Sequence, residues 1–570
     1  FPLPMRLSFL LLALAAAPSA AAQTLYVDAN LTTGAGDGSS WADAFQGPGG
    51  LQDALAAASG GEIWVAQGTY LPSTAGSRAG TFRLESGLAI RGGFAGGETS
   101  AFERPARGAA PSVLSGDLSG NDTASATTRV DNSFHVVNAQ GANATALLDR
   151  FTIVGGNANG GGSNNDRGGG ILCAGNFAPR VVDCDFVDNR CTFGGGAGYI
   201  NNGGDPEFIG CRFEDNVGGQ FGGAFDIAFG GSILFDGCWF EGNRAVRAGA
   251  LEIFGTNQAV VANSVFVDNT VTGSSGGGAL WFGNGSSSRV VGCTIVENTA
   301  NTNAAGGIRV QGANPRIQNC ILWGNTGTGT NTAANQVTLT ANVSHSLVEG
   351  GFAGGTGNIA ADPQFTDQAQ RDFTLPLTSP AVDAADGDAL VAGLVSDFAG
   401  GRRAFDAPAA DTGTGTPSFV DMGAFEATTD IGAYYCEAIV NASGLPGRIR
   451  AVGSVAAADN DVTLVAEDLT PNQFGIFVVG AESGFAPATG GVGTLCLGGQ
   501  LGRYSQMNQI LDSGPNGTFT LDIDLTAIPQ GGVNASTGAG DTWYFQAWYR
   551  DVVFITTTSN FTDAVAITFE

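Results

Sequence analysis

Two acidic residues at matching positions of consecutive sequence repeats are the first candidates for chemistry. Asp226 and Glu252 each lie between two apolar residues, in Phe-Asp-Ile and Leu-Glu-Ile. If the apolar neighbours face a core, both carboxylates point outward from adjacent strands, with Cα atoms roughly 4.8 Å apart. Carboxylates that close can share a proton or a cation. Paired carboxylates are also the groups that a retaining glycosidase uses.

Aromatic and basic residues occupy the same position in the neighbouring repeats. Tyr199 precedes the acidic pair, and Trp281 and Arg309 follow it. Aromatic faces offer apolar area on which sugar rings can stack. We therefore expect an outward ligand-binding column of Tyr199, Asp226, Glu252, Trp281 and Arg309, with Asp226, Glu252 and Arg309 as the catalytic candidates. The alternative is an ordinary solvated strand face, which also carries polar and aromatic residues.

These positions belong to a repeat that dominates residues 183–325. Short runs that alternate with period two are separated by small-residue phrases such as Gly222-Gly223-Ala224. The runs are strand-like and too short for helices. Each repeat also contains one Asn at a fixed position: Asn189, Asn216, Asn243, Asn269, Asn298 and Asn325. A repeat of this length, built from about three short strands, predicts a parallel β-helix.

In such a solenoid every recurring residue forms a column along the axis. We expect the Asn residues to form an amide ladder in which each side chain bonds the next. We expect the Cys residues of the repeat to be small buried side chains rather than disulfide or metal ligands. These are Cys184, Cys211, Cys238, Cys293 and Cys320.

A second acidic column stands directly before the Asn ladder. Its members are Asp188, Asp215, Asp268 and Glu297. Carboxylate oxygens suit Ca²⁺, so this column could bind that ion, although turn residues of this kind are more often simply solvated. No other cofactor is expected.

The repeat resembles those of known families. Phe-x-x-Asn alternating with Gly-Gly-Ala-apolar resembles the repeat pair of bacterial polymorphic outer-membrane proteins. More broadly it resembles the right-handed parallel β-helix superfamily that includes pectate lyases. The segments Ser379-Pro380-Ala381-Val382-Asp383 and Asp421-Met422-Gly423-Ala424-Phe425-Glu426 are similar to the exit region of choice-of-anchor β-helix proteins. That resemblance implies an exported protein with a C-terminal attachment module, and it indicates fold more than function.

The predicted organisation is all-β: a right-handed parallel β-helix followed by a C-terminal β-sandwich. Residues 1–22 are predicted to be a signal peptide, with a start-site extension at 1–4, because a short apolar run ends in Ala20-Ala21-Ala22. The β-helix and its N-terminal cap are expected over 23–426, a linker over 427–433 and the β-sandwich over 434–570. In an exported protein, Cys436 and Cys496 are expected to form a disulfide.

Composition argues against several classes of function. The chain has 24 basic and 52 acidic residues, a net charge of −28, and none of the basic residues is lysine. Such a surface disfavours nucleic acids and anionic membranes. Its two histidines are not in metal-type spacing, which argues against a zinc enzyme or a histidine-based hydrolase. Beyond the signal peptide no apolar run is long enough to span a membrane.

The sequence therefore predicts a secreted or cell-surface protein that acts as a binding or adhesive scaffold. A stiff, repetitive face suits a polymer, so the predicted partner is an extracellular polysaccharide or cell-surface glycan. The alternative is a polysaccharide-degrading enzyme, either a lyase or a glycoside hydrolase, with its active site on the outer face of the solenoid. A lyase needs a cluster of acids that binds Ca²⁺ and a Lys or Arg as base; Arg309 is available for that role, whereas the chain has no lysine.

Overall fold

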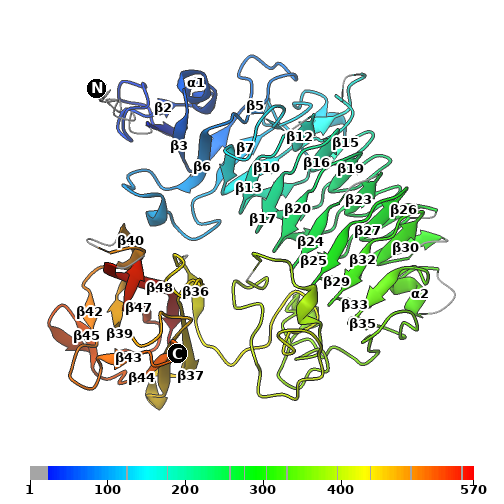
Figure 1. The fold of residues 1–570 in the computed structure, drawn as a ribbon. Coiled ribbons are helices and arrows are strands. Elements are labelled where there is room, and N and C mark those ends of the chain that lie inside the picture. Colours follow the sequence, from blue (N-terminus) through cyan, green and yellow to red (C-terminus); the bar gives the residue numbers. More distant parts are fainter. Residues whose placement is uncertain are drawn as a thin grey trace, which may run out of the picture.

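The computed structural model describes residues 23–570 except 124–125, 163, 176, 256–257, 275, 303–304, 329–331, 395, 437, 488–490 and 554–555. The predicted signal peptide lies outside these residues. A long solenoid is followed in the chain by a separate C-terminal domain, which lies below the N-terminal half of the solenoid in the view of Figure 1. Among the described residues, no helix is both long and apolar enough to cross a membrane.

A small cap closes the N-terminal end of the solenoid. It consists of β1 (Thr24–Asp28), β2 (Phe45–Gln46), α1 (Gly50–Ala57) and β3 (Gly61–Ala66). Leu51 and Ala54 of α1 are fully buried in the same hydrophobic core as the first strands. The helix thereby covers apolar side chains that the open end of a solenoid would expose to water.

The solenoid contains three long parallel sheets. The twelve-stranded sheet runs β2, β1, β3, β6 (Leu88–Phe94), β9 (Leu147–Asp149), β13 (Arg180–Val182), β17 (Glu207–Ile209), β20 (Leu234–Asp236), β24 (Val260–Ala262), β28 (Arg289–Val291), β32 (Arg316–Gln318) and β34 (Asn342–Ser344). The ten-stranded sheet runs β4 (Gly68–Tyr70), β7 (Ser112–Ser115), β10 (Phe151–Val154), β14 (Asp185–Val187), β18 (Arg212–Glu214), β21 (Trp239–Glu241), β25 (Val265–Val267), β29 (Thr294–Val296), β33 (Ile321–Trp323) and β35 (Leu347–Val348).

The third sheet has eight strands: β5 (Phe82–Arg83), β8 (Val137–Asn138), β12 (Ile171–Ala174), β16 (Gly198–Asn201), β19 (Phe225–Ala228), β23 (Leu251–Phe254), β27 (Leu280–Gly283) and β31 (Ile308–Gln311). Smaller parallel sheets join β11 (Asn157–Ala158) to β15 (Arg190–Cys191), and β22 (Arg244–Ala245) to β26 (Thr270–Ser274) and β30 (Thr299–Thr302). Near the far end lies α2 (Thr332–Gln336). Each repeat thus contributes one strand to each long sheet, as the sequence predicts.

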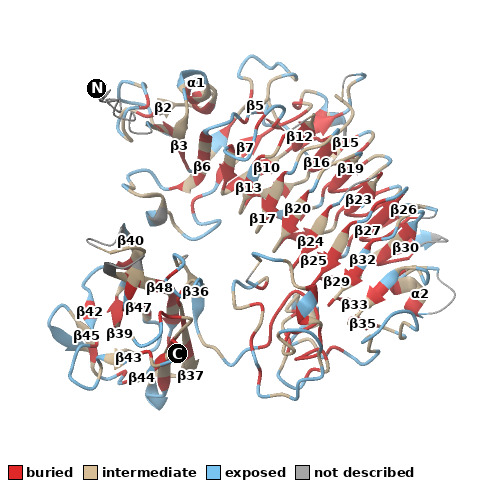
Figure 2. Ribbon diagram, viewed as in Figure 1, coloured by how far each residue is buried: buried red, intermediate tan, exposed pale blue. Residues whose placement is uncertain are grey.

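The interior is a stack of identical positions. Phe186, Phe213, Phe240 and Phe266 lie one above another with ring centroids 5.2, 4.7 and 4.5 Å apart. The five Cys residues of the repeat are fully buried free thiols. Buried positions follow the strands of every coil (Figure 2). The close stacking means that one core continues through all the coils.

The Asn residues of the repeat are hydrogen-bonded along the axis. Asn243 Nδ2 donates to Phe213 O at 2.7 Å and to Asn269 Oδ1 at 2.9 Å. Asn243 Oδ1 accepts from the backbone amide and the Nδ2 of Asn216. Equivalent bonds run from Asn189 to Asn325, where Gln336 of α2 accepts the last pair. The amides therefore hold a buried turn in the same conformation on each coil.

The acidic residues before the Asn ladder have a backbone role. Asp188, Asp215, Asp268 and Glu297 have φ angles of 50°, 54°, 54° and 57°. This left-handed region favours Gly, and Asp or Asn among other residues. Gly242 and Gly324 take the same place on the other coils, with φ of 65° and 66°. The turn geometry accounts for the alternation of Asp, Gly and Glu at this position of the repeat.

An exit segment, residues 362–427, folds back along the solenoid. It contains the short 3₁₀ helices η3 (Gln368–Gln370) and η4 (Gly387–Ala389). Phe373 and Phe425 pack on Trp239, Val265 and Val296, which point outward from the ten-stranded sheet. The amide of Ala424 also donates to Thr294 Oγ1 at 3.0 Å. The exit segment therefore covers the C-terminal part of that sheet.

The C-terminal domain has two main antiparallel sheets around one core. One contains β36 (Ala433–Tyr435), β48 (Thr556–Thr568), β47 (Thr542–Val553), β39 (Phe474–Gly480), β42 (Gly502–Arg503) and β43 (Leu511–Asp512). The other contains β37 (Arg448–Gly453), β38 (Val462–Glu467) and β44 (Phe519–Ile523); two hairpins are β40 (Glu482–Pro487) with β41 (Thr494–Gly498), and β45 (Ile528–Gln530) with β46 (Val533–Ala535). Ile449 and Leu464 from one main sheet and Phe477 and Phe545 from the other share a hydrophobic cluster, as in a sandwich.

The segment between the solenoid and the C-terminal domain is held by strand pairing and ion pairs, unlike the free linker that the sequence predicts. β36 begins at Ala433, the last residue of the predicted linker, because that residue pairs with β48. Arg402 of the exit segment forms ion pairs with Glu467 at 2.5 Å and Asp468 at 2.6 Å of the C-terminal domain. A disulfide joins Cys436 to Cys496, with Cα atoms 6.4 Å apart.

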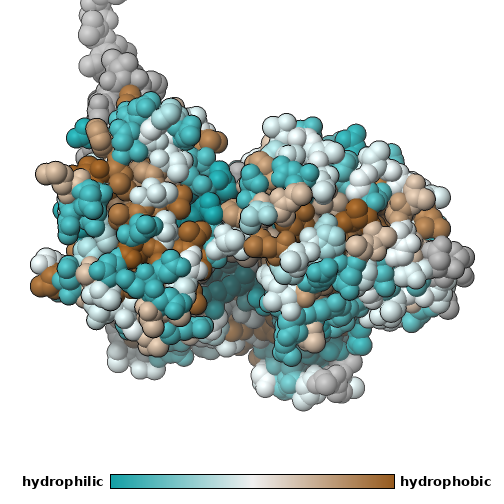
Figure 3. Space-filling view, turned by 90° about the horizontal axis from the view of Figure 1, so that it is seen from below, coloured by the Kyte–Doolittle hydropathy of each residue, from teal (hydrophilic) through white to brown (hydrophobic). Residues whose placement is uncertain are grey.

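Figure 3 views the molecule from below, and hydrophobic side chains gather on its left part.

Candidate functional site

The column proposed from the sequence has the expected register on the eight-stranded sheet. Tyr199 pairs with Asp226, Asp226 with Glu252, Glu252 with Trp281, and Trp281 with Arg309. The expected solvent exposure is wrong, however. The exposed fractions of Tyr199, Asp226, Glu252 and Trp281 are 1, 3, 2 and 5%, and Arg309 is half-buried.

Side chains from the preceding loops cover this column. Arg167 donates to the hydroxyl of Tyr199 at 2.8 Å and lies over the ring of Phe193. Arg247 bonds Glu252 at 2.7 Å and lies over the rings of Phe221 and Trp281. The strands do point these residues away from the core, but the loops add a second layer over them.

Burial changes the electrostatics of the acidic pair. The pKa values of Asp226 and Glu252 are both raised, in each case chiefly by burial. The negative charge of Asp226 raises the pKa of Glu252 further, while Arg247 lowers it. Two adjacent carboxyl groups in such a place hold protons at a pH where exposed carboxylates have lost them. The pair has the acid–base character expected from the sequence, but no open access.

A cavity of about 310 Å³ lies next to the covered column. Arg247, Phe254 and Trp281 line it, together with Val246, Ser274, Asn284 and Gln311. The ring of Trp281 stacks on that of Phe254 with centroids 6.3 Å apart. Trp281 therefore remains available to a ligand at its edge, whereas Tyr199 does not line this cavity.

A larger groove, of about 800 Å³, lies on another side of the solenoid. It follows the carboxyl ends of β7, β10, β14, β18 and β21 of the ten-stranded sheet. Of these strands, β21 is the one whose outward Trp239 packs against the exit segment. The charged lining of the groove consists of Asp117, Asp122, Arg129, Asp188, Arg190, Asp215 and Arg244. Because neighbouring strands are about 4.8 Å apart, these five strand ends span roughly 19 Å along the axis.

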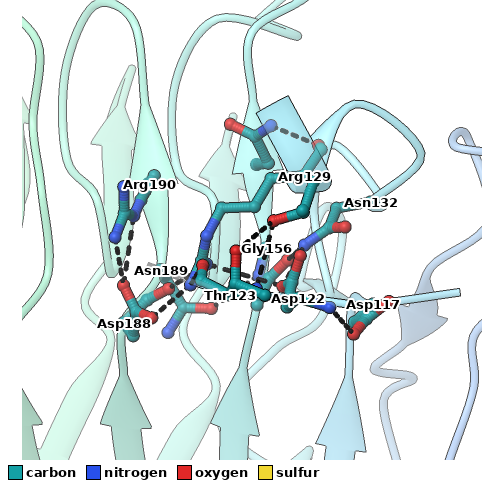
Figure 4. Close-up of polar contacts among 12 residues, drawn as sticks. Asp117, Asp122, Thr123, Arg129, Asn132, Gly156, Asp188, Asn189 and Arg190 are labelled. Atoms are coloured by element: carbon teal, nitrogen blue, oxygen red, sulfur yellow. Dashed lines mark hydrogen bonds and ion pairs between the residues drawn. The ribbon is translucent and has the colours of Figure 1, made fainter. Parts of the chain in front are cut away.

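One wall of the groove is fixed by an ion-pair network around Arg129 (Figure 4). Arg129 is 4% exposed, contacts Asp122 Oδ2 at 3.6 Å and donates to the side chain and the backbone oxygen of Asp188. Asn132 Nδ2 donates to Asp122 at 2.8 Å and to Gly155 O at 2.6 Å. This wall is therefore rigid.

The other wall presents side chains that have more freedom. Asp215 and Arg244 are exposed, and Arg190 is half-buried and pairs with Asp188 at 3.1 Å. Burial and the neighbouring Asp188 and Glu241 raise the pKa of Asp215, while Arg244 lowers it. Asp215 and Arg244 are the groups that a ligand in the groove would meet first.

The acidic column before the Asn ladder is divided between two environments. Asp188 and Asp215 line the groove, whereas Asp268 and Glu297 lie beside Arg371 of the exit segment. The guanidinium of Arg371 thus occupies the place at which the sequence suggested a cation. Ca²⁺ binding at Asp188 and Asp215 stays a prediction.

Sequence reasoning did not find Asp117, Asp122 and Arg129, because their loop precedes the regular repeats. Asp117 accepts backbone amides from Gly120 at 2.8 Å and Asp122 at 2.9 Å, so its carboxylate shapes the loop. The sequence signal for that turn is the run Asp117-Leu118-Ser119-Gly120-Asn121, which is rich in turn-forming residues. Nothing in the sequence shows that the loop lies against Asp188.

Comparisons with known proteins agree with the fold. Residues 122–295 match the family model described as a right handed beta helix region. Comparison with curated proteins gives no match. Among solved structures, the enzymatically active domain of bacteriophage CBA120 tailspike protein 4 is similar at 11% identity and a TM-score of 0.20, over 93% of this chain and 67% of that one. A TM-score this low carries no argument about this protein.

Proposed function

We propose that this right-handed parallel β-helix protein is an extracellular scaffold that binds a polysaccharide in the groove along the strand ends of the ten-stranded sheet. The observation that carries the proposal is the groove itself, about 800 Å³ in volume and lined by both carboxylates and guanidinium groups. It runs along the axis of the solenoid across five strand ends. A long, rigid and polar groove suits an extended polymer better than a compact ligand.

The lining supports a hydroxyl-rich ligand. Ionised carboxylates accept hydrogen bonds and guanidinium groups donate them, so both kinds of contact with sugar hydroxyls are available. Four Asp and three Arg line the groove, and the whole chain carries a net charge of −28. A field of that sign opposes the approach of polyanions, so neutral glycans are favoured over uronate-rich ones. This also argues against a pectate-lyase type of activity.

The experiment compares two exposed arginines of neighbouring coils. Arg244 lines the groove, whereas Arg212, at the start of β18, does not. Arg244→Ala is expected to weaken binding to a neutral-glycan array by about tenfold or more, since a hydrogen bond to a charged group is lost. Arg212→Ala, the matched control, should leave binding unchanged. Equal effects of the two variants, or no glycan bound by the unaltered protein, would overturn the proposal.

A second candidate function, glycoside hydrolysis, rests on Asp226 and Glu252. Their raised pKa values supply the protonated carboxyl group that an acid catalyst needs at neutral pH. Reaching them requires Arg247 to leave Glu252. If the pair is catalytic, Glu252→Gln should abolish release of reducing ends while binding in the groove persists. Release of reducing ends at the unaltered rate by that variant would remove this candidate.

Secretion is part of the proposal and rests on the sequence of residues 1–22. The mature protein is expected to begin at Gln23, which directly follows the Ala-rich cleavage pattern. N-terminal sequencing of protein from the culture medium or cell surface tests this. Protein that keeps Met5 and stays in the cytosol would contradict it.

A further inference from the structure

Three carboxylates of the exit segment meet at a place separate from both the groove and the covered column. Asp383, Asp406 and Asp411 bring their carboxylate oxygens within 4.8 Å of one another. Asp383 is fully buried, while Asp406 and Asp411 are exposed. The cluster therefore has one oxygen donor inside the protein and two at its surface.

The buried member lacks the partners that such a group needs. Both carboxylate oxygens of Asp383 are inaccessible to water and without a hydrogen-bond partner among the described residues. The backbone amide of Ala407 approaches this carboxylate without reaching hydrogen-bond geometry, and Asp406 and Asp411 bring like charge close to it. A buried carboxylate without a partner destabilises the folded state unless something compensates for its lost hydration.

An adjacent acidic cluster in the same segment has the compensation that this one lacks. Arg403, 2% exposed, lies 3.3 Å from Glu426 and donates to Asp421 O at 2.9 Å. The two clusters touch, because Asp421 Oδ1 accepts the backbone amide of Asp383 at 2.7 Å. In the part of the chain that the structure describes, no arginine or histidine forms an ion pair with Asp383, Asp406 or Asp411.

We propose that Asp383, Asp406 and Asp411 bind a divalent cation, with Ca²⁺ as the best fit. Three carboxylates and no nitrogen or sulfur donor form a hard oxygen site. Ca²⁺ accepts more ligands than three and tolerates irregular geometry, and the exposed side of the cluster leaves room for water to complete its shell. The ion enters from the side of Asp406 and Asp411.

The bound ion would join two parts of the exit segment. Asp383 is anchored inside, where its backbone oxygen accepts the amides of Thr412 and Gly413 at 2.8 Å each. Asp406 and Asp411 lie on the loop that leads to those amides. The site therefore fastens this loop to the buried turn, within the segment that covers the ten-stranded sheet.

Melting temperatures measured in EDTA, in CaCl₂ and in MgCl₂ test the proposal, with calorimetric titration of CaCl₂ for stoichiometry. The unaltered protein should melt at a higher temperature in CaCl₂ than in EDTA, because a ligand of the folded state stabilises it. Mg²⁺ should act more weakly. The double variant Asp406→Asn/Asp411→Asn should bind Ca²⁺ about tenfold more weakly or not at all, since two ligands lose their charge.

The sign of the effect in EDTA separates an ion site from a structural cluster. Without Ca²⁺, the double variant should be at least as stable as the unaltered protein, because it removes repulsion around Asp383. Asp362→Asn, at an exposed acid of the same segment, is the matched control and should keep the full Ca²⁺ response. An equal Ca²⁺ response in the double variant and the unaltered protein would overturn the site. So would a double variant that is destabilised equally in EDTA and in CaCl₂.

Discussion

The two parts of the ten-stranded sheet share a repeat but differ in what lies on their outer face. In β14 and β18, the outward residues are Asp185, Val187, Arg212 and Glu214, and polar groups dominate. In β25 and β29, they are Val265, Val267, Thr294 and Val296, all fully buried under the exit segment. The inward residues barely change between the two parts. The inward residues of the repeat thus determine the conformation of each coil. The outward residues are apolar on the coils that the exit segment covers and mostly polar on the others.

The same division separates the acidic turn residues. Asp268 and Glu297 lie beside Arg371, whereas Asp188 and Asp215 lie in the groove. A residue whose presence is explained by a left-handed turn can therefore serve as an ion-pair partner on one coil and as a groove wall on another. Turn geometry accounts for the residue type, and the surroundings decide its role.

The largest expected effect comes from the ladder that underlies both parts of the sheet. Asn243→Leu leaves the amide and the Nδ2 of Asn216 without an acceptor and Phe213 O without a donor. At about 1–3 kcal/mol for each stranded buried group, the free energy of unfolding should fall by about 5 kcal/mol. Chemical denaturation measures this, and Arg244→Ala on the same coil should change it by less than about 0.5 kcal/mol. Similar losses in both variants would refute the structural role of the ladder.

The second effect concerns only the covered part. Phe373 is 1% exposed and stacks on Trp239 with ring centroids 6.0 Å apart. Phe373→Ala should cost about 3–4 kcal/mol and leave a cavity beneath the exit segment. Limited proteolysis should then cut within residues 362–427 before the solenoid. If cleavage begins in the solenoid instead, the exit segment does not detach from the ten-stranded sheet before the solenoid unfolds, which contradicts its description as an outer layer.

The third effect is a pH dependence of the acidic pair on the eight-stranded sheet. Folding raises the pKa values of Asp226 and Glu252, so above about pH 4 the folded state holds protons that the unfolded state has released. Stability contributed by these groups is therefore present at low pH and is lost as the pH rises through the raised pKa values. Asp226→Asn should reduce that loss by about 1–2 kcal/mol at alkaline pH. Unfolding curves from pH 4 to 9 that are parallel for both proteins would contradict the assignment.

The smallest effect is that of the ion pairs over the covered acidic turns. Arg371 is about one-third exposed and contacts Asp268, Glu241 and Glu297. Arg371→Met should cost less than about 1 kcal/mol, and high salt should shrink the difference because exposed ion pairs are screened. Arg212→Met on the uncovered part is the matched control. A cost that salt leaves unchanged would mean that Arg371 acts by packing rather than by charge.

Much of the fold could be predicted from the sequence, because each coil repeats the same local choices. The repeat period alone predicts the Phe, Cys and Asn columns. It also predicts the register of Tyr199 with Asp226 and Glu252, which the structure confirms. The burial of that register did not follow, since it depends on where Arg167 and Arg247 extend from loops with no strand pattern. For the ten-stranded sheet, by contrast, the sequence does carry a sign of the exit segment, because outward positions become apolar at Val265 and Val296.

The groove could not be predicted for a related reason. Asp188 and Asp215 belong to the repeat, so the sequence predicts them as an acidic column. Asp122 and Arg129 come from an irregular loop more than fifty residues earlier in the chain than Asp188. Their meeting is a long-range contact that one sequence does not encode as a pattern. The acidic cluster at Asp383, Asp406 and Asp411 is likewise brought together only by the path of the exit segment.

The buried thiols along the solenoid axis allow the local unfolding of individual coils to be measured. Cys184, Cys211, Cys238, Cys293 and Cys320 are fully buried and lie on different coils, so an alkylating reagent reaches each one only when its coil opens. In a stack where each coil contacts its neighbours, opening can start at an end and spread. Peptide mass spectrometry after timed alkylation would then give a rate for each coil. A gradient from Cys320 or Cys184 inward would identify the end that frays, and equal rates would mean that the whole stack unfolds as one unit.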